Sequence, residues 1–217
     1  LAAADSDGIF IAESDGVVIG SMRVTANRVD TTASTATTDT SKTQEDLTTA
    51  NDGAIVLTAT DITLGAGTGG AALTADGSGN VLLSATAADM DINANVDAGS
   101  GHITLLATSG TLTQDADVIT SSTGTIDVEA DAITFNDGDS TSTGSGNIRY
   151  KATNAMSIGD ITTTGDVSLI AASITDSGTT DTDVSADELR INVIGTGGVG
   201  DRKSTRLNSS HQIISYA

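Results

Sequence analysis

The sequence predicts an all-β chain that folds as a parallel β-helix, a β-solenoid with three short strands in each coil of about 22 residues. A seven-residue phrase recurs along the chain at intervals of 26, 22, 23, 22, 19 and 22 residues. Each repeat of a solenoid buries its apolar face only by stacking on its neighbours, so this period favours that architecture. Only 2% of the residues are aromatic, and small aliphatic side chains suit a thin, regular stack.

The phrase is interpreted as the first strand of each coil. Apolar residues occupy its third, fifth and seventh positions, and six of the seven copies begin with glycine. Successive side chains of a strand point to opposite sides, so these three positions are expected to face inward. The copies are GAIVLTA (53–59), GNVLLSA (79–85), GHITLLA (101–107), GTIDVEA (124–130), GNIRYKA (146–152), GDVSLIA (165–171) and the decayed DELRINV (187–193).

Two weaker apolar segments follow each copy and predict the second and third strands. Gly-Ser and Thr-Gly clusters, such as residues 99–101 and 143–146, are typical of the turns between them. Parallel crossovers are right-handed in most folds, which predicts a right-handed helix. The expected inward residues are Ile62, Leu64, Met90, Ile92, Ile133, Phe135, Met156 and Ile158 in the second strands, and Val96, Ile119, Ile161 and Val184 in the third.

A β-sandwich array is the competing fold class, because it also has short, regularly spaced strands. Its unit, however, is roughly 100 residues long. Nothing in this chain repeats at that length, so the solenoid is the better interpretation.

The chain is expected to divide into three parts. Residues 1–52 form irregular or partial coils, with strand-like runs at 9–11 and 17–19 after Asp-Gly pairs. A further strand-like run follows at residues 22–26. Residues 30–52 are mostly Thr, Ser, Ala and Asp, and we interpret them as a loop excursion or a loosely formed coil. Residues 53–200 form the regular solenoid. Residues 201–217 are treated as a separate tail.

The charge and hydropathy of the chain indicate which classes of partner it is not expected to bind. The net charge of −20 disfavours nucleic acid and anionic membrane, because binding to phosphates needs clustered Lys and Arg. No run approaches the roughly 18 apolar residues of a membrane span, so no membrane insertion is expected in this segment. The chain begins at Leu1 without an initiator Met, and we interpret it as an internal fragment of a longer protein.

No catalytic, cofactor-binding or metal-binding residue is predicted. His102 is expected to point outward, and no Cys accompanies it to complete a zinc site. Gly195, Gly197 and Gly200 match the dinucleotide fingerprint, but that motif requires a βαβ unit, which is not predicted here. The only basic residues of the phrases are Arg149, Lys151 and Arg190, and no long loop supplies a cleft wall around them.

Acidic turns offer carboxylates at residues 5–8, 76–77 and 136–139. Asp and Asn before Gly are favoured in turns for backbone reasons, and that is our interpretation of these three segments. Weak calcium binding is the alternative, although neither the EF-hand loop nor the calcium-binding nonapeptide repeat occurs.

Two successive copies predict an outward charge pattern. If GTIDVEA lies under GNIRYKA in register, Asp127 aligns with Arg149 and Glu129 with Lys151. Opposite charges would then face each other across one hydrogen-bonded step.

Residues 53–193, with their glycine-led GxIxLxA phrase, Thr/Ser/Asp/Gly-rich corners, absence of cysteine and strong acidity, resemble the bacterial β-strand-repeat proteins. These are similar to filamentous-haemagglutinin-type adhesin exoproteins. The resemblance implies a right-handed β-helix in a large secreted or surface-displayed bacterial repeat protein. Its function would be structural and adhesive, it would not be an enzyme, and its partner would be an unknown surface glycan or protein. The alternatives are a calcium-stabilised repeat module and a β-helix enzyme that degrades polysaccharides.

The last seventeen residues, DRKSTRLNSSHQIISYA (201–217), resemble the translated read-through of a sequencing adapter. The resemblance implies that this segment is non-native, and we expect a disordered tail there.

Overall fold

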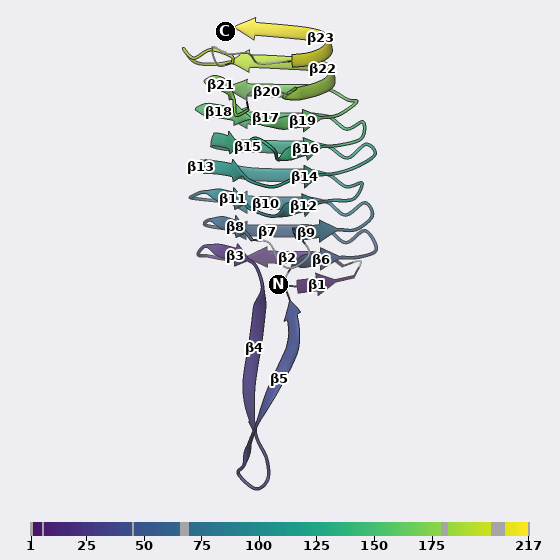
Figure 1. The fold of residues 1–217 in the computed structure, drawn as a ribbon, viewed down its shortest axis with the longest axis vertical. Helices are drawn as coiled ribbons and strands as arrows, with labels where there is room; N and C mark the ends of the chain where they lie inside the picture. The colour runs from purple at the N-terminus through teal and green to yellow at the C-terminus, as the bar shows by residue number, and fades with distance from the viewer. Residues whose placement is uncertain are drawn as a thin grey trace.

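A computed structural model describes residues 2–5, 7–44, 46–65, 70–178, 182–200 and 207–216. The chain is an all-β parallel solenoid, consistent with the predicted right-handed β-helix, and its coils are stacked along one axis (Figure 1). Equivalent residues of successive coils lie about 22 positions apart, as in the pairing of Ile126 with Ile148. The predicted fold class is therefore confirmed. No helix in these ranges is long and apolar enough to cross a membrane.

Three parallel ladders of strands run the length of the stack. The first ladder contains β2 (Ile9–Ala12), β7 (Ile55–Ala59), β10 (Val81–Ala85), the N-terminal halves of β13 (Ile103–Gln114) and β15 (Ile126–Phe135), β17 (Ile148–Ala152), β20 (Val167–Ala171) and the C-terminal half of β22 (Val184–Val193). Every copy of the seven-residue phrase therefore supplies a strand to this ladder.

The other two ladders use shorter strands. The second contains β3 (Val17–Ile19), β8 (Ile62–Leu64), β11 (Met90–Ile92), the C-terminal halves of β13 and β15, β18 (Ala155–Ile158) and β21 (Ser173–Asp176). The third contains β1 (Ala2–Ala4), β6 (Leu47–Thr49), β9 (Ala71–Ala75), β12 (Asn95–Asp97), β14 (Val118–Ile119), β16 (Ser140–Ser142), β19 (Asp160–Thr162) and the N-terminal half of β22.

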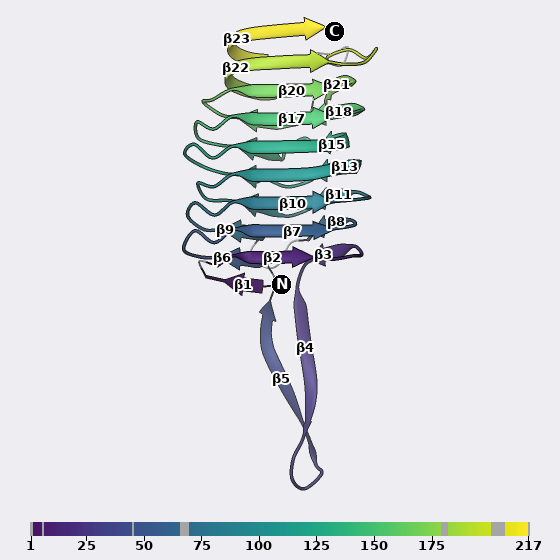
Figure 2. The ribbon, with the colours of Figure 1, turned by 180° about the vertical axis from the view of Figure 1, so that it is seen from behind.

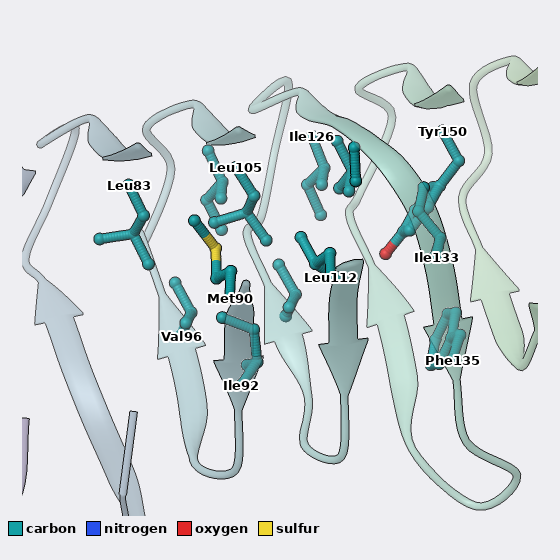
Figure 3. Packing of buried hydrophobic residues seen from close by; sticks show 14 of the residues in the cluster. Leu83, Met90, Ile92, Val96, Leu105, Leu112, Ile126, Ile133, Phe135 and Tyr150 are labelled. Carbon is teal, nitrogen blue, oxygen red and sulfur yellow. The ribbon is translucent and has the colours of Figure 1, made fainter. Parts of the chain in front are cut away.

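The core lies between the three ladders, and inward side chains stack on their equivalents in the next coil (Figure 3). In the first ladder Leu83 pairs with Leu57 on one side and Leu105 on the other, and all three are fully buried. The residues predicted to face inward in the second ladder are all buried as well. Alternation along each strand therefore decides which residues form the core.

One predicted inward residue of the third ladder is wrong. Val118, not Ile119, pairs with the buried Val96 and is itself fully buried. Ala116, Val118 and Thr120 alternate inward, which leaves Ile119 on the outward side and only half-buried. A strand of two residues carries too little alternation for its face to be read from apolarity alone.

The glycine that opens the phrase has a steric reason. Gly124 and Gly146 are buried at the corner before the first ladder, where successive coils approach closely. A Cβ on Gly146 would overlap the carbonyl oxygen of Gly124. The same corner is tied together by threonines, since the Thr143 hydroxyl donates to the Gly124 carbonyl at 2.6 Å and the Thr163 hydroxyl to the Gly146 carbonyl at 2.7 Å.

A polar cluster interrupts the aliphatic core. The Tyr150 hydroxyl donates to Oε1 of Gln114 at 2.7 Å, and Nε2 of Gln114 donates to Oγ1 of Thr141 at 3.0 Å. The ring of Tyr150 stacks on Phe135 with centroids 6.0 Å apart. Burial raises the pKa of Tyr150 well above its usual range. Each of these buried polar side chains has a partner, as stability requires.

Residues 22–44 form a hairpin, which includes the strand-like run expected at 22–26 and part of the segment (30–52) expected to be a loop or loose coil. The strands β4 (Met22–Val29) and β5 (Thr35–Gln44) pair antiparallel, and the hairpin projects from the N-terminal end of the stack (Figures 1 and 2). Asp30 closes its turn by accepting from the backbone N–H groups of Thr32 at 2.8 Å and Ser34 at 3.0 Å. Residues 26–36 are all exposed, so this part of the hairpin has no buried face to produce the apolar alternation that predicts a strand. The next strand, β6, rejoins the third ladder and buries Leu47.

The C-terminal segment also differs from expectation. Leu207–Tyr216 form β23, which pairs in parallel with β22, instead of a disordered tail. The exposed edge of a parallel ladder carries unpaired backbone groups that accept a further strand whatever its side chains are. Residues 201–206 and 217 lie outside the described residues, and the non-native origin of the tail remains a prediction.

Candidate ligand groove on the first ladder

A groove of about 580 Å³ lies on the outward side of the first ladder. It crosses β15, β17, β20 and β22, which are neighbours in that order. The groove therefore runs along the axis of the stack, at right angles to its strands.

The walls of the groove are two rows of outward side chains, separated along each strand by one inward residue. Because inward and outward residues alternate, the groove lies between the second and fourth positions of four successive phrases. The first row is Thr125, Asn147, Asp166 and Glu188; the second row is Asp127, Arg149, Ser168 and Arg190; and between them lie Ile126, Ile148, Val167 and Leu189, whose side chains face the core.

The N-terminal end of the second row is held by ion pairs. Nε of Arg149 lies 2.7 Å from Oδ1 of Asp127, and its Nη2 lies 3.1 Å from Oε2 of Glu129. Nζ of Lys151 lies 2.7 Å from Oε1 of Glu129. The predicted alignment of Asp127 with Arg149 and of Glu129 with Lys151 is thereby confirmed.

These ion pairs change the pKa values of their members. The hydrogen bond from Lys151 holds the pKa of Glu129 below its usual range, against a smaller opposing effect of burial. The hydrogen bond from Arg149 to Asp127 raises the pKa of the guanidinium. The four side chains are 27 to 39% exposed, so the pairs orient the groove wall more than they stabilise the fold.

The C-terminal half of the groove carries polar groups that are not engaged with one another. Asp166, Glu188 and Arg190 are exposed, and within the described part of the chain their side chains make no ion pair or hydrogen bond. Ser168 pairs in register with Arg149 on one side and Arg190 on the other. Its Oγ is buried and has no hydrogen-bond partner.

The first row is positioned by bonds between coils. Oδ1 of Asn147 accepts from the backbone N–H of Asp166 at 3.0 Å. Two coils earlier in the stack, Nδ1 of His102 accepts from the backbone N–H of Thr125 at 3.0 Å. His102 is exposed, as expected, and its hydrogen bond orients Thr125, the first residue of the row. The hydrogen-bonding side chains at the second position of successive phrases are the sequence pattern that could have predicted this row.

The predicted acidic turns lie elsewhere, at corners of the stack. Gly8, Gly77 and Gly138 have φ values of 80°, 63° and 91°, which agrees with turns that need the left-handed region. At one corner, burial and the neighbouring Asp115 and Asp117 raise the pKa of Asp139. No group of three or more His, Cys, Asp or Glu side chains in the described ranges is placed to hold a metal ion.

The glycine fingerprint of residues 195–200 gains no site from the fold. Gly195 and Gly197 lie in the irregular segment after β22, and Gly200 has a φ of 82°. Arg149 and Arg190 nevertheless lie in one groove, although no cleft is predicted around them from the sequence.

Comparisons of the chain with protein-family models, with curated proteins and with solved structures found no match. The function is therefore argued from the groove and the solenoid.

Proposed function

We propose that this chain is a structural and adhesive segment of a large secreted or surface-displayed bacterial repeat protein, and that it has no active site of its own. The observation that supports the proposal is the groove on the outside of a continuously stacked solenoid. A solenoid supplies reach because each coil contacts only its neighbours and the stack extends in one direction.

The separation of inward side chains, which form the core, from outward side chains, which form the surface, supports an adhesive function. The inward positions of the first ladder are buried in every described coil from β7 to β22, so the outward positions can vary without loss of the core. On such a scaffold the lateral surface is available for binding, and the groove is its concave part.

An attachment assay tests this proposal. Beads coated with the chain are expected to attach, under flow, to at least one surface in a panel of immobilised polysaccharides and proteins. Beads coated with an unrelated protein of similar net charge serve as the control. Attachment no greater than that of the control on every surface would contradict the adhesive function.

Two further readouts separate the alternatives. A polysaccharide-degrading enzyme would release new chain ends from soluble polymers, which the proposed segment does not do. A calcium-stabilised module would show a melting temperature that rises with calcium, because a ligand that binds only the folded state stabilises it.

A further inference from the structure

We propose that the groove binds a neutral polysaccharide whose chain lies along the axis of the stack. This inference rests on the proposed adhesive function and specifies its ligand.

The shape of the groove favours an extended polymer. It crosses four parallel strands, and neighbouring strands lie about 4.8 Å apart. Its two rows therefore present a side chain at each step along the axis. A linear chain meets one pair of polar wall residues at every step, whereas a compact ligand would contact fewer of the four pairs.

The chemistry of the walls suits hydroxyl groups. Asp166 and Glu188 offer carboxylate acceptors, Arg190 offers guanidinium donors, and none of them is engaged by another described side chain. Sugar hydroxyls donate and accept, so they can satisfy both rows at once. Hydrogen bonds to ionised groups are the stronger kind.

The charge of the groove disfavours an anionic polymer. Asp127, Asp166 and Glu188 outnumber Arg149 and Arg190 in the lining, and Arg149 is already paired with Asp127 and Glu129. The whole chain carries a net charge of −20. Long-range repulsion therefore opposes uronic-acid and sulfated polymers, and a neutral chain avoids it.

The backbone of the groove disfavours an extended peptide. Peptides that bind sheets usually add a strand to an open edge, where main-chain groups are unpaired. Here β17 and β20 are paired on both sides, so the floor of the groove offers no backbone ladder. Recognition must come from side chains, as it does for sugars.

Isothermal titration calorimetry with soluble oligosaccharides tests the inference. The probes are hexamers of neutral sugars (glucose, mannose, galactose and xylose), oligogalacturonate, sulfated dextran and an extended polar peptide. We expect at least one neutral hexamer to bind, with an affinity that changes little between about 0.05 and 0.5 M salt, because no counterion is released.

A pair of matched variants locates the site. Asp166→Ala with Arg190→Ala removes one acid and one base from the groove and is expected to weaken binding about tenfold or more. Asp91→Ala with Arg28→Ala removes the same charges from the second ladder and the hairpin, and it should bind like the parent chain. The melting temperatures of both variants show that they remain folded.

Each outcome bears on a different claim. Equal binding by both variants would overturn the groove as the site while leaving the adhesive function standing. Binding of only the anionic polymers, or of only the peptide, would overturn the neutral ligand. If the chain binds no probe here and also fails the attachment assay, the proposed function itself is contradicted.

Discussion

The outward side of the first ladder has two dissimilar halves. In the N-terminal half, Phe10, Val56 and Leu82 align in register and form an apolar strip, and Phe10 is 69% exposed. In the C-terminal half, Arg149 and Arg190 occupy the same phrase position as Leu82 and belong to the groove. The inward side is a buried stack in both halves, aliphatic in the first ladder except at Tyr150. The fold therefore depends on the inward positions, and the outward positions are where function can differ from coil to coil.

The largest expected effect is the difference in stability between substituting an inward residue and substituting an outward residue of the same strand. Leu105 is fully buried with coils on both sides, whereas Leu106 faces outward and is half-buried. Leu105→Ala should lower the free energy of unfolding by about 2 to 5 kcal/mol through lost burial and a cavity. Leu106→Ala should cost less than about 1 kcal/mol. Urea denaturation measures both, and equal losses would show that the faces are assigned wrongly.

A second prediction concerns the column of glycines at the corner that precedes the first-ladder strand in each coil. Gly146→Ala places a methyl group against the Gly124 carbonyl, so adjacent coils must separate. We expect a loss of about 1 to 3 kcal/mol, the usual cost of overpacking. Gly198→Ala is the control, because a Cβ there meets nothing within 4 Å. If Gly146→Ala unfolds at the same urea concentration as the control, the close stacking of the glycine column is not required.

The charged half should respond to charge reversal. Asp127→Lys with Glu129→Lys sets like charges against Arg149 and Lys151, and each pair should change stability by roughly 0.2 to 1 kcal/mol, at the low end because these side chains are partly exposed. Adding Arg149→Glu and Lys151→Glu should restore most of the loss at low salt. A fourfold variant no more stable than the double variant would mean that these ion pairs do not form.

The smallest effects are in the pH dependence of stability, and they have opposite signs. The hydrogen bond from Lys151 lowers the folded-state pKa of Glu129. The ionised Glu129 therefore stabilises the fold above the pKa that it has in the unfolded chain. This stabilisation is lost as the pH falls through the folded-state pKa. The folded-state pKa of Asp139 is raised by burial and by Asp115 and Asp117. Its cost to stability therefore appears as the pH rises above the ordinary value of 3.8.

Neutral variants of these two residues make the comparison measurable. Glu129→Gln should reduce stability at about pH 7 and have no effect below both pKa values, whereas Asp139→Asn should increase stability at about pH 7 and have no effect in strong acid. Urea midpoints across the acid range give both differences. The same sign for both variants would contradict the assigned causes.

The predictable part of the structure is the part that repeats. Leu57, Leu83 and Leu105 could be placed inward from sequence because alternation and the period agree. Ile119 was misplaced because its strand has only two residues. The strand β5 is not predicted, because the exposed residues 26–36 of this two-stranded ribbon need no apolar face.

The groove was only half predictable. The alignment of Asp127 with Arg149 followed from the period, but Asp166, Ser168 and Glu188 are ordinary polar residues when read singly. Extending the same register by two more copies places Ser168 beside Arg149 and Arg190 beside Ser168. The concave surface depends on side chains 19 to 22 residues apart, and it becomes visible only when all the coils are aligned.

The most direct test of this account maps a bound neutral oligosaccharide by the changes it causes in backbone amide NMR shifts. We predict shifts that recur once per coil within residues 125–127, 147–149, 166–168 and 188–190, the four segments that line the groove. The aligned apolar strip at Phe10, Val56 and Leu82 should not respond. Shifts confined to that strip, with the four groove segments unchanged, would contradict the account.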